Sequence, residues 1–344
     1  MKKIIFATLA AAALVACAKE EPIALNQEAI GFTNAFVDGS VRSVDPSITT
    51  TGEKGIKTFK VYGTTQGDWT GAEVVNIFND VKVEGQVVAL DGGGYSSVWD
   101  YQSAYVQYWI DNNKYDFAAV VNGNVDVNSV GMPETITYTA DGETDLLYAY
   151  NHLGTYTKGV TPTQVPFTFN HLLSKAKFTV KNTIATNSEH QAYTYKVSDV
   201  KITNAYASGT YTVRPADITD GSWGSQSGEF VTEFGDIDTA ADGVLVAATG
   251  AINGELQAES HDERLLIPGR RELNIVANIE LYLNNKLVDK IDYNKWVVVE
   301  FAKGTSYNFI IELGNPGDEI KFTVTQVNGW AEGGNVTAPA YPAQ

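Results

Sequence analysis

Cysteine is almost absent from the chain, because Cys17 is the only one among 344 residues. A single cysteine excludes a disulfide framework, so the folded state must depend on packing and hydrogen bonds. The four histidines are isolated, and none forms the His-Glu-x-x-His pattern of a zinc protease. Residues 91–94 are rich in glycine but lack the Lys-Ser/Thr ending of a phosphate-binding loop. These absences predict a protein that is not an enzyme and has no catalytic residue, cofactor or bound metal.

Basic residues are scarce, since 24 Lys and Arg stand against 41 Asp and Glu and give a formal net charge of −17. Binding to a nucleic-acid backbone depends on clustered Lys and Arg, so no nucleic-acid partner is expected. The same charge opposes an anionic membrane surface, and attachment to a membrane would therefore need a lipid anchor. Long apolar runs are missing too: the one near the N-terminus is shorter than the ~20 residues of a membrane-spanning helix.

The first residues have the pattern of a secretory signal. Two lysines precede a short apolar run, and Leu14-Val15-Ala16 precede Cys17. Small residues before a cysteine resemble a bacterial lipobox, in which the cysteine becomes an acylated N-terminus. We therefore expect a signal peptide over residues 1–16 and a palmitate-bearing lipid anchor on Cys17 in the outer membrane. Lys19-Glu20-Glu21 resembles the surface-export signals of such lipoproteins, so an outward orientation is expected.

Alternation of apolar and polar residues dominates the rest of the chain. It is clear at residues 175–181 and 320–325, and residues 275–283 and 287–291 flank an Asn-Asn turn that favours a hairpin. Residues 296–301 and 307–313 are further strand candidates, whereas the Gly- and Ser-rich residues 219–228 are expected to form a loop. No stretch predicts an amphipathic helix of more than a turn or two. The fold class predicted is all-β, with antiparallel β-sandwiches.

A domain boundary is expected near residues 159–166, where two prolines and a glycine interrupt strand pairing. This gives a signal peptide over 1–16, a lipidated propeptide with a removable first strand over 17–42, an N-terminal β-sandwich over 43–165, and a C-terminal β-sandwich with a tail over 166–344.

Five segments in order carry a resemblance to a known family. They are Tyr-Trp-Ile at 108–110 with Tyr-Asp-Phe-Ala-Ala at 115–119, Asp-Leu-Leu-Tyr-Ala at 145–149, Phe-Thr-Phe-Asn-His-Leu-Leu-Ser-Lys-Ala-Lys-Phe at 167–178, Arg-Leu-Leu-Ile-Pro at 264–268, and Gly-Trp at 329–330. Together they resemble the fimbrillin family of two-domain pilus subunits and their lipoprotein relatives. The resemblance implies two transthyretin-like β-sandwiches in tandem and a structural or adhesive role in cell-surface fimbriae.

That family assembles by strand exchange, and the resemblance implies where this chain carries the parts. Residues 30–37, with Ile30, Phe32 and Phe36, resemble a first strand that completes the N-terminal sandwich and can be removed. Arg42 follows in a polar loop, about where an arginine-specific surface protease cuts the family, and such a cut would make Ser43 the new N-terminus. Other fimbrial subunits are then the expected partners, and the fimbrium and the outer membrane the expected locations.

Two other interpretations stay open at this stage. Six tryptophans and 18 tyrosines could supply stacking platforms for sugars, which would fit a permanently anchored glycan-binding lipoprotein or a pilus anchor that keeps Cys17. Residues 122–128 and 236–243 contain oxygen ligands that could bind calcium, but neither has the spacing of a known loop. The tail after Trp330 alternates small residues and fits either a donor strand or a loose end.

Overall fold

The computed structural model describes residues 27–37, 56–89, 95–184, 188–190, 192–213, 221–235, 237–238, 257–260, 262–327 and 336–337. These residues form strands and one short 3₁₀ turn, η2 (Ser103–Tyr105), which confirms the all-β class. Within the same ranges, no helix has the length and apolar character needed to cross a membrane. Cys17, Arg42 and Ser43 lie outside the described residues, so their expected roles stay predictions.

Most strands follow one another through short turns, as expected for antiparallel pairing. Their bounds are β1 (Gly31–Val37), β2 (Thr58–Gln66), β3 (Val74–Ala89), β4 (Tyr95–Tyr101), β5 (Lys114–Val121), β6 (Asn124–Val127), β7 (Pro133–Thr139), β8 (Leu147–Thr155), β9 (Gln164–His171), β10 (Ser174–Asn182), β11 (Tyr193–Ala205), β12 (Ser208–Thr212), β13 (Ser222–Ser227), β14 (Phe230–Gly235), β15 (Ile237–Asp238), β16 (Gln257–Ser260), β17 (Arg264–Leu266), β18 (Gly269–Leu283), β19 (Lys286–Phe301), β20 (Ser306–Leu313), β21 (Lys321–Val327) and β22 (Val336–Thr337).

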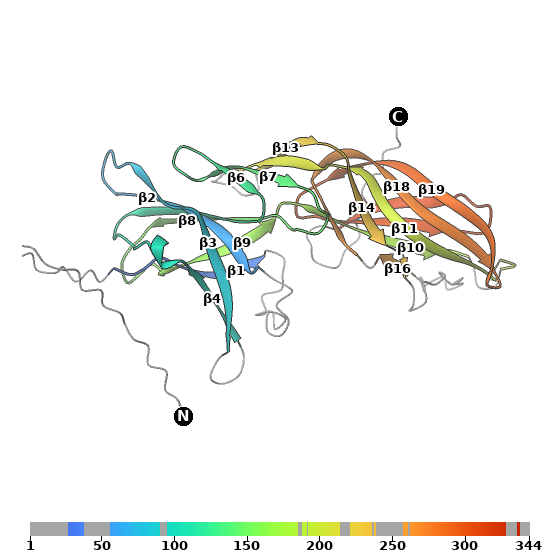
Figure 1. The fold of residues 1–344 in the computed structure, drawn as a ribbon, viewed down its shortest axis with the longest axis horizontal. Coiled ribbons are helices and arrows are strands. Elements are labelled where there is room, and N and C mark those ends of the chain that lie inside the picture. The colour runs from blue at the N-terminus through green and yellow to red at the C-terminus, as the bar shows by residue number, and fades with distance from the viewer. Residues whose placement is uncertain are drawn as a thin grey trace, which may run out of the picture.

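Seven strands of the N-terminal part close into a barrel in the order β1-β4-β3-β2-β5-β8-β9. Alternate side chains of each strand point inward, so Phe59 and Val61 of β2 and Phe117 of β5 share one core with Phe167 of β9. The barrel occupies one end of an elongated molecule (Figure 1). Closure depends on β1, which pairs with β4 on one side and with β9 on the other.

The C-terminal part is a sandwich of two sheets around a second core. One sheet has the order β15-β16-β10-β20-β21-β22, with β17 also paired to β10, and the other has the order β14-β11-β18-β19. Phe178 of β10 stacks on Phe309 of β20 at a centroid distance of 5.1 Å and meets Phe234 of β14 edge-on at 4.8 Å. The contact of Phe178 with Phe234 crosses between the two sheets and helps to hold them face to face.

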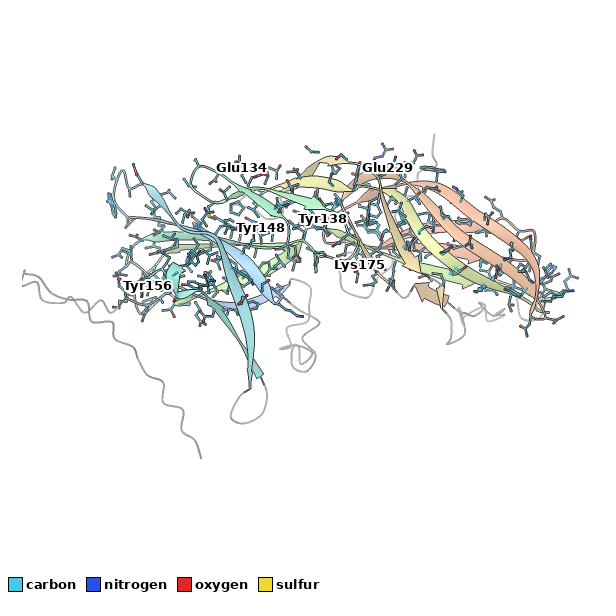
Figure 2. All side chains as sticks on the ribbon, viewed as in Figure 1. Glu134, Tyr138, Tyr148, Tyr156, Lys175 and Glu229 are labelled. Carbon is cyan, nitrogen blue, oxygen red and sulfur yellow. The ribbon has the colours of Figure 1, made fainter. Side chains whose placement is uncertain are left out.

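A bridging sheet, β13-β12-β7-β6, joins the barrel to the C-terminal sandwich. Its β6 and β7 come from the N-terminal half of the chain and its β12 and β13 from the C-terminal half, as Figure 1 shows. A third core lies beneath it, where Tyr138 and Tyr148 are buried together with Leu172, and Figure 2 places both tyrosines at this junction. The indole of Trp223 donates to the carbonyl of Leu172 at 2.7 Å. The two halves are therefore packed together rather than joined by a bare linker.

The structure refines three expectations about single segments. Residues 222–227 form strand β13 rather than a loop, because their backbone pairs with β12 in spite of the glycine- and serine-rich sequence. The predicted hairpin is present, with Asn284 and Asn285 at φ 50° and 65°, but β19 continues without a break to Phe301. Strand β9, which begins at the expected domain boundary, pairs with β8 and β1 of the barrel. The division of the chain after residue 165 stays a prediction.

Candidate strand-exchange site

The expected removable strand occupies a slot in the barrel. β1 runs parallel to β9, with Phe32 opposite Val165 and Val37 opposite Phe169, and it meets β4 in antiparallel register at Trp99. The pairing with β9 shifts between Thr33 and Phe36. Because β1 has a neighbour on each side, its loss would open the barrel and leave the backbone groups of β4 and β9 without partners.

Phe32 is the apolar centre of this site. Its side chain is 2% exposed, and that of the neighbouring Ile30 is 1% exposed. Five aromatic rings surround the Phe32 ring at centroid distances between 5.5 and 6.3 Å, those of Phe59, Phe78, Tyr101, Phe117 and Phe167. The slot that β1 fills is therefore an aromatic groove, and an apolar side chain must occupy it to keep water out of the barrel.

Hydrogen bonds fix the beginning of β1. The Tyr101 hydroxyl donates to the Ile30 carbonyl at 2.6 Å, and the Ile30 amide donates to the Gln107 carbonyl at 2.8 Å. The Gly31 amide donates to the Thr163 carbonyl at 3.1 Å. Burial raises the pKa of Tyr101 above its ordinary value, so this hydroxyl stays a donor through neutral pH.

A second tyrosine holds the residues just before β1. The Tyr156 hydroxyl donates to the Glu28 carboxylate at 2.9 Å, and the Trp109 amide donates to the Glu28 carbonyl at 2.9 Å. Burial first, and then the hydrogen bond and charge of Glu28, raise the pKa of Tyr156 to about 12. Tyr156 lies at the outer end of the barrel in Figure 2. The precursor segment is thus bound through backbone and side-chain contacts before β1 begins.

The structure brings together some of the predicted site residues. Ile30 and Phe32 share the barrel core. The backbone of Phe36 pairs opposite Thr168, while its side chain is outside what the structure describes. The groove-lining rings were missed as site residues, although the alternation around Phe59, Phe117 and Phe167 predicts that they face one side of their strands. Their convergence on β1 depends on long-range pairing that the local pattern does not contain.

The histidines and the calcium candidates have ordinary structural partners. His171 Nδ1 lies 2.6 Å from a carboxylate oxygen of Asp145, and His152 Nδ1 lies 2.6 Å from Asp116. The Asn128 amide oxygen accepts the backbone amides of Val130 and Met132 and so closes its own turn. In the part of the chain that the structure describes, no three His, Cys, Asp or Glu side chains gather as metal ligands; most of residues 236–243 lies outside that part.

Comparisons with known proteins include a matching sequence family and solved structures. The sequence profile of the fimbrillin-like family matches residues 46–330. A solved fimbrial protein from Bacteroides vulgatus is 16% identical, with a TM-score of 0.60, and the match covers 89% of this chain and 100% of that one. A solved fimbrial assembly protein from Parabacteroides distasonis is 12% identical, with a TM-score of 0.39 over 81% of this chain and 90% of that one. Among curated proteins, none matches the chain in sequence.

Proposed function

The chain belongs to the fimbrillin-like family, and from this premise we propose that it is a cell-surface fimbrial adhesive subunit that assembles by donor-strand exchange. It is exported as a lipoprotein precursor, anchored in the outer membrane through Cys17 and cut between Arg42 and Ser43. The family points to a structural, non-enzymatic subunit. Its partners are other fimbrial subunits, and at the cell surface a host or glycan receptor.

The place of β1 in the barrel is the observation that carries this proposal. Ile30 and Phe32 are both buried, and burying an apolar side chain of this size contributes ~1.5–3 kcal/mol. These two side chains alone therefore hold β1 with about 3–6 kcal/mol, to which backbone pairing with β9 adds. While β1 is covalently attached, a strand from another subunit would also have to overcome an association cost of ~4–15 kcal/mol that the attached strand avoids.

A cut after Arg42 would remove this advantage. β1 ends at Val37, so the cut leaves the whole strand on the released fragment and the barrel on the other. The fragment can then dissociate, and a strand from a neighbouring subunit can enter the groove by β-augmentation. The same cut separates the subunit from the lipid on Cys17. Proteolysis thus acts as the switch for assembly and for release from the membrane.

The C-terminal segment is the donor that this geometry favours. β22 is held to β21 by two registered pairs, Thr325 with Thr337 and Gln326 with Val336. Such short pairing opposes departure of the segment only weakly. A stalk subunit would use this segment as its donor, whereas a tip or anchor subunit would not, and truncation after Trp330 separates these cases.

Replacement of Arg42 by alanine tests the switch. The Arg42→Ala protein should remain monomeric and lipid-bound on cells, while wild type forms polymers that begin at Ser43. Arg270→Ala is the matched control, because Arg270 is an exposed arginine of β18, and its polymers should form normally. Normal polymers from Arg42→Ala would refute the mechanism. Retention of a modified Cys17 in wild type would favour an anchored glycan-binding lipoprotein or a pilus anchor.

A further inference from the structure

Exposed apolar side chains gather at the outer end of the barrel. Gln66 of β2, Lys114 of β5 and Thr155 of β8 lie side by side in register, so the loops that adjoin them meet at this end. The Asn112 amide donates to the Tyr156 carbonyl at 2.9 Å and ties two of these loops together. Large exposed apolar side chains on these loops are those of Trp69, Tyr108, Ile110 and Val160. Exposed apolar side chains that gather at one end of a molecule are candidates for a contact with another molecule.

Trp69 is the most prominent of these side chains and is held in place. It is 68% exposed, yet a Cβ atom built on Gly67 would lie 1.8 to 2.3 Å from three of its ring carbons. The indole therefore rests directly on the backbone of Gly67 and turns its other face to solvent. The hairpin beneath it is closed by hydrogen bonds from Gln66 Nε2 to the Ala72 carbonyl at 2.9 Å and from the Ala72 amide to the Trp69 carbonyl at 3.0 Å. The Trp69 side chain and its hairpin together form a projecting knob. Because this knob is ordered before binding, it loses little entropy on association.

The opposite end of the molecule has a groove of about 400 Å³. It lies between β19 and the connection from β20 to β21, near the β18–β19 turn that forms the far end of the sandwich in Figure 1. Its walls include the apolar side chains of Leu281, Ile291 and Ile320. Tyr293 also lines it, is 7% exposed, and has a hydroxyl without a hydrogen-bond partner among the residues that the structure describes.

We propose that the Trp69 hairpin of one copy of the chain seats in this groove of the next copy. The inference rests on the proposed function and adds a second contact to strand exchange. The two surfaces differ and lie at opposite ends, so the contact is heterologous and repeats into an open filament rather than a closed dimer. Buried Trp and Tyr side chains are the residues that most often dominate such interfaces.

The direction of the strands favours a second copy over another occupant. β21 begins beside the groove, since Ile320 lines it, and β22 runs antiparallel to β21. β22 therefore runs toward the end of the sandwich that carries the groove, and the neighbour's barrel end would sit at this end. On that neighbour, β1 begins at the same barrel end as Trp69, because Ala29 pairs with Tyr108. Seating of the Trp69 hairpin in the groove of the C-terminal sandwich would thus bring the donor strand close to the start of the aromatic groove that β1 fills.

Charge gives the contact a recognisable salt dependence. Asp68 and Glu73 flank the Trp69 hairpin, and Asp289, Asp318 and Glu319 line the groove with Lys295 as a cation. Both surfaces are net acidic, so they repel each other at low ionic strength. Screening by salt should therefore speed assembly, whereas a contact made by opposite charges would be slowed.

A photoreactive amino acid at position 69 tests the contact in assembled fimbriae. Cross-links are expected from position 69 to the groove segments 281–295 or 314–320 of a second copy. Cross-links that reach only other segments of the chain, or the absence of any cross-link to a second copy, would overturn the proposal. Cross-links to carbohydrate would also overturn it and would identify a glycan site. Absence of any fimbriae from the wild-type chain would instead contradict the proposed function, so the two failures are distinguishable.

Two substitutions remove the knob by different routes. Trp69→Ala deletes the ring, and Gly67→Ala displaces it, since Gly67 has no positive φ and alanine fits the backbone. Assembly should become roughly thirtyfold weaker in both, the size of a hot-spot truncation. Release of the β1 fragment after the cut should be unchanged. Asp289→Trp, which fills the groove from an exposed position, should act likewise. Val231→Ser, at an exposed valine of β14 that belongs to neither surface, is the matched control. Unchanged assembly in the knob and groove variants would overturn the proposal.

Discussion

Replacement of Phe32 by alanine separates the two roles of β1. Five aromatic rings surround the Phe32 side chain, and its removal leaves a cavity that the barrel cannot easily close. Truncations of this kind cost ~3–5 kcal/mol. The uncut Phe32→Ala precursor should therefore unfold at a lower urea concentration, with the midpoint reporting the loss.

The same change should have the opposite effect on assembly. Once the chain is cut, β1 is a bound fragment, and a loss of ~3–5 kcal/mol weakens its binding roughly a hundredfold to a few thousandfold. The β1 fragment then leaves the aromatic groove of the barrel sooner, while the incoming donor strand is unaltered. A less stable precursor should thus polymerise faster after the cut, as followed by light scattering with the released fragment quantified by mass spectrometry.

Thr33→Ala is the matched control for this experiment, because Thr33 is the next residue on β1 and is only partly buried. It should change neither the urea midpoint nor the polymerisation rate appreciably. If Phe32→Ala destabilises the precursor and leaves the polymerisation rate of the cut protein unchanged, departure of β1 is not the step that controls assembly. The reasoning would then be refuted, although the packing around Phe32 would stand.

Three further predictions address the aromatic groove of the barrel, the residues just before β1, and bound calcium. Gly63→Ala places a Cβ atom 2.9 Å from a Phe117 ring carbon and 3.0 Å from one of Phe78, and overpacking of this kind should cost ~1–3 kcal/mol in thermal or urea unfolding; an unchanged midpoint would contradict the packing. The pKa of Tyr156 is raised from 10.0 to about 12, so its contribution to stability is complete below pH 10 and is lost as the pH rises toward 12. The melting temperature of the precursor should fall over that window, and by less in Glu28→Gln, which removes a cause of the raised pKa; equal falls would contradict the Tyr156–Glu28 contact. Calcium should leave the melting temperature unchanged, because the Asn128 oxygen is occupied by backbone amides, and a rise would indicate a site at residues 122–128 or 236–243.

Local alternation was sufficient to predict many strands but not their partners. The pattern of residues 175–181 predicts β10, and the Asn-Asn turn predicts the β18–β19 hairpin, because both depend on neighbours in sequence. The bridging sheet could not be predicted in this way, since β7 and β12 are far apart in the chain and pair through backbone groups. β13 was not predicted because its glycine- and serine-rich sequence lacks the alternation of a strand, although its backbone pairs with β12.

The sequence predicts which segment forms the candidate site, but not which strands and side chains surround that segment. Resemblance indicates a removable strand over residues 30–37 with Ile30, Phe32 and Phe36. The structure buries Ile30 and Phe32, whereas the side chain of Phe36 lies outside the described part. The aromatic groove around these side chains is built from β2, β3, β4, β5 and β9. No local sequence pattern predicts that these strands come together. The Tyr156–Glu28 contact joins residues 128 positions apart, which places it beyond any motif.

The identity of the first residue in purified fimbriae tests the central claim most directly. Mass spectrometry of the intact subunit should find a chain that begins at Ser43, with the fragment that contains Phe32 absent from the polymer. Polymers whose subunits begin at a lipid-bearing Cys17, and so still carry β1 in the barrel, would contradict assembly by exchange of this strand.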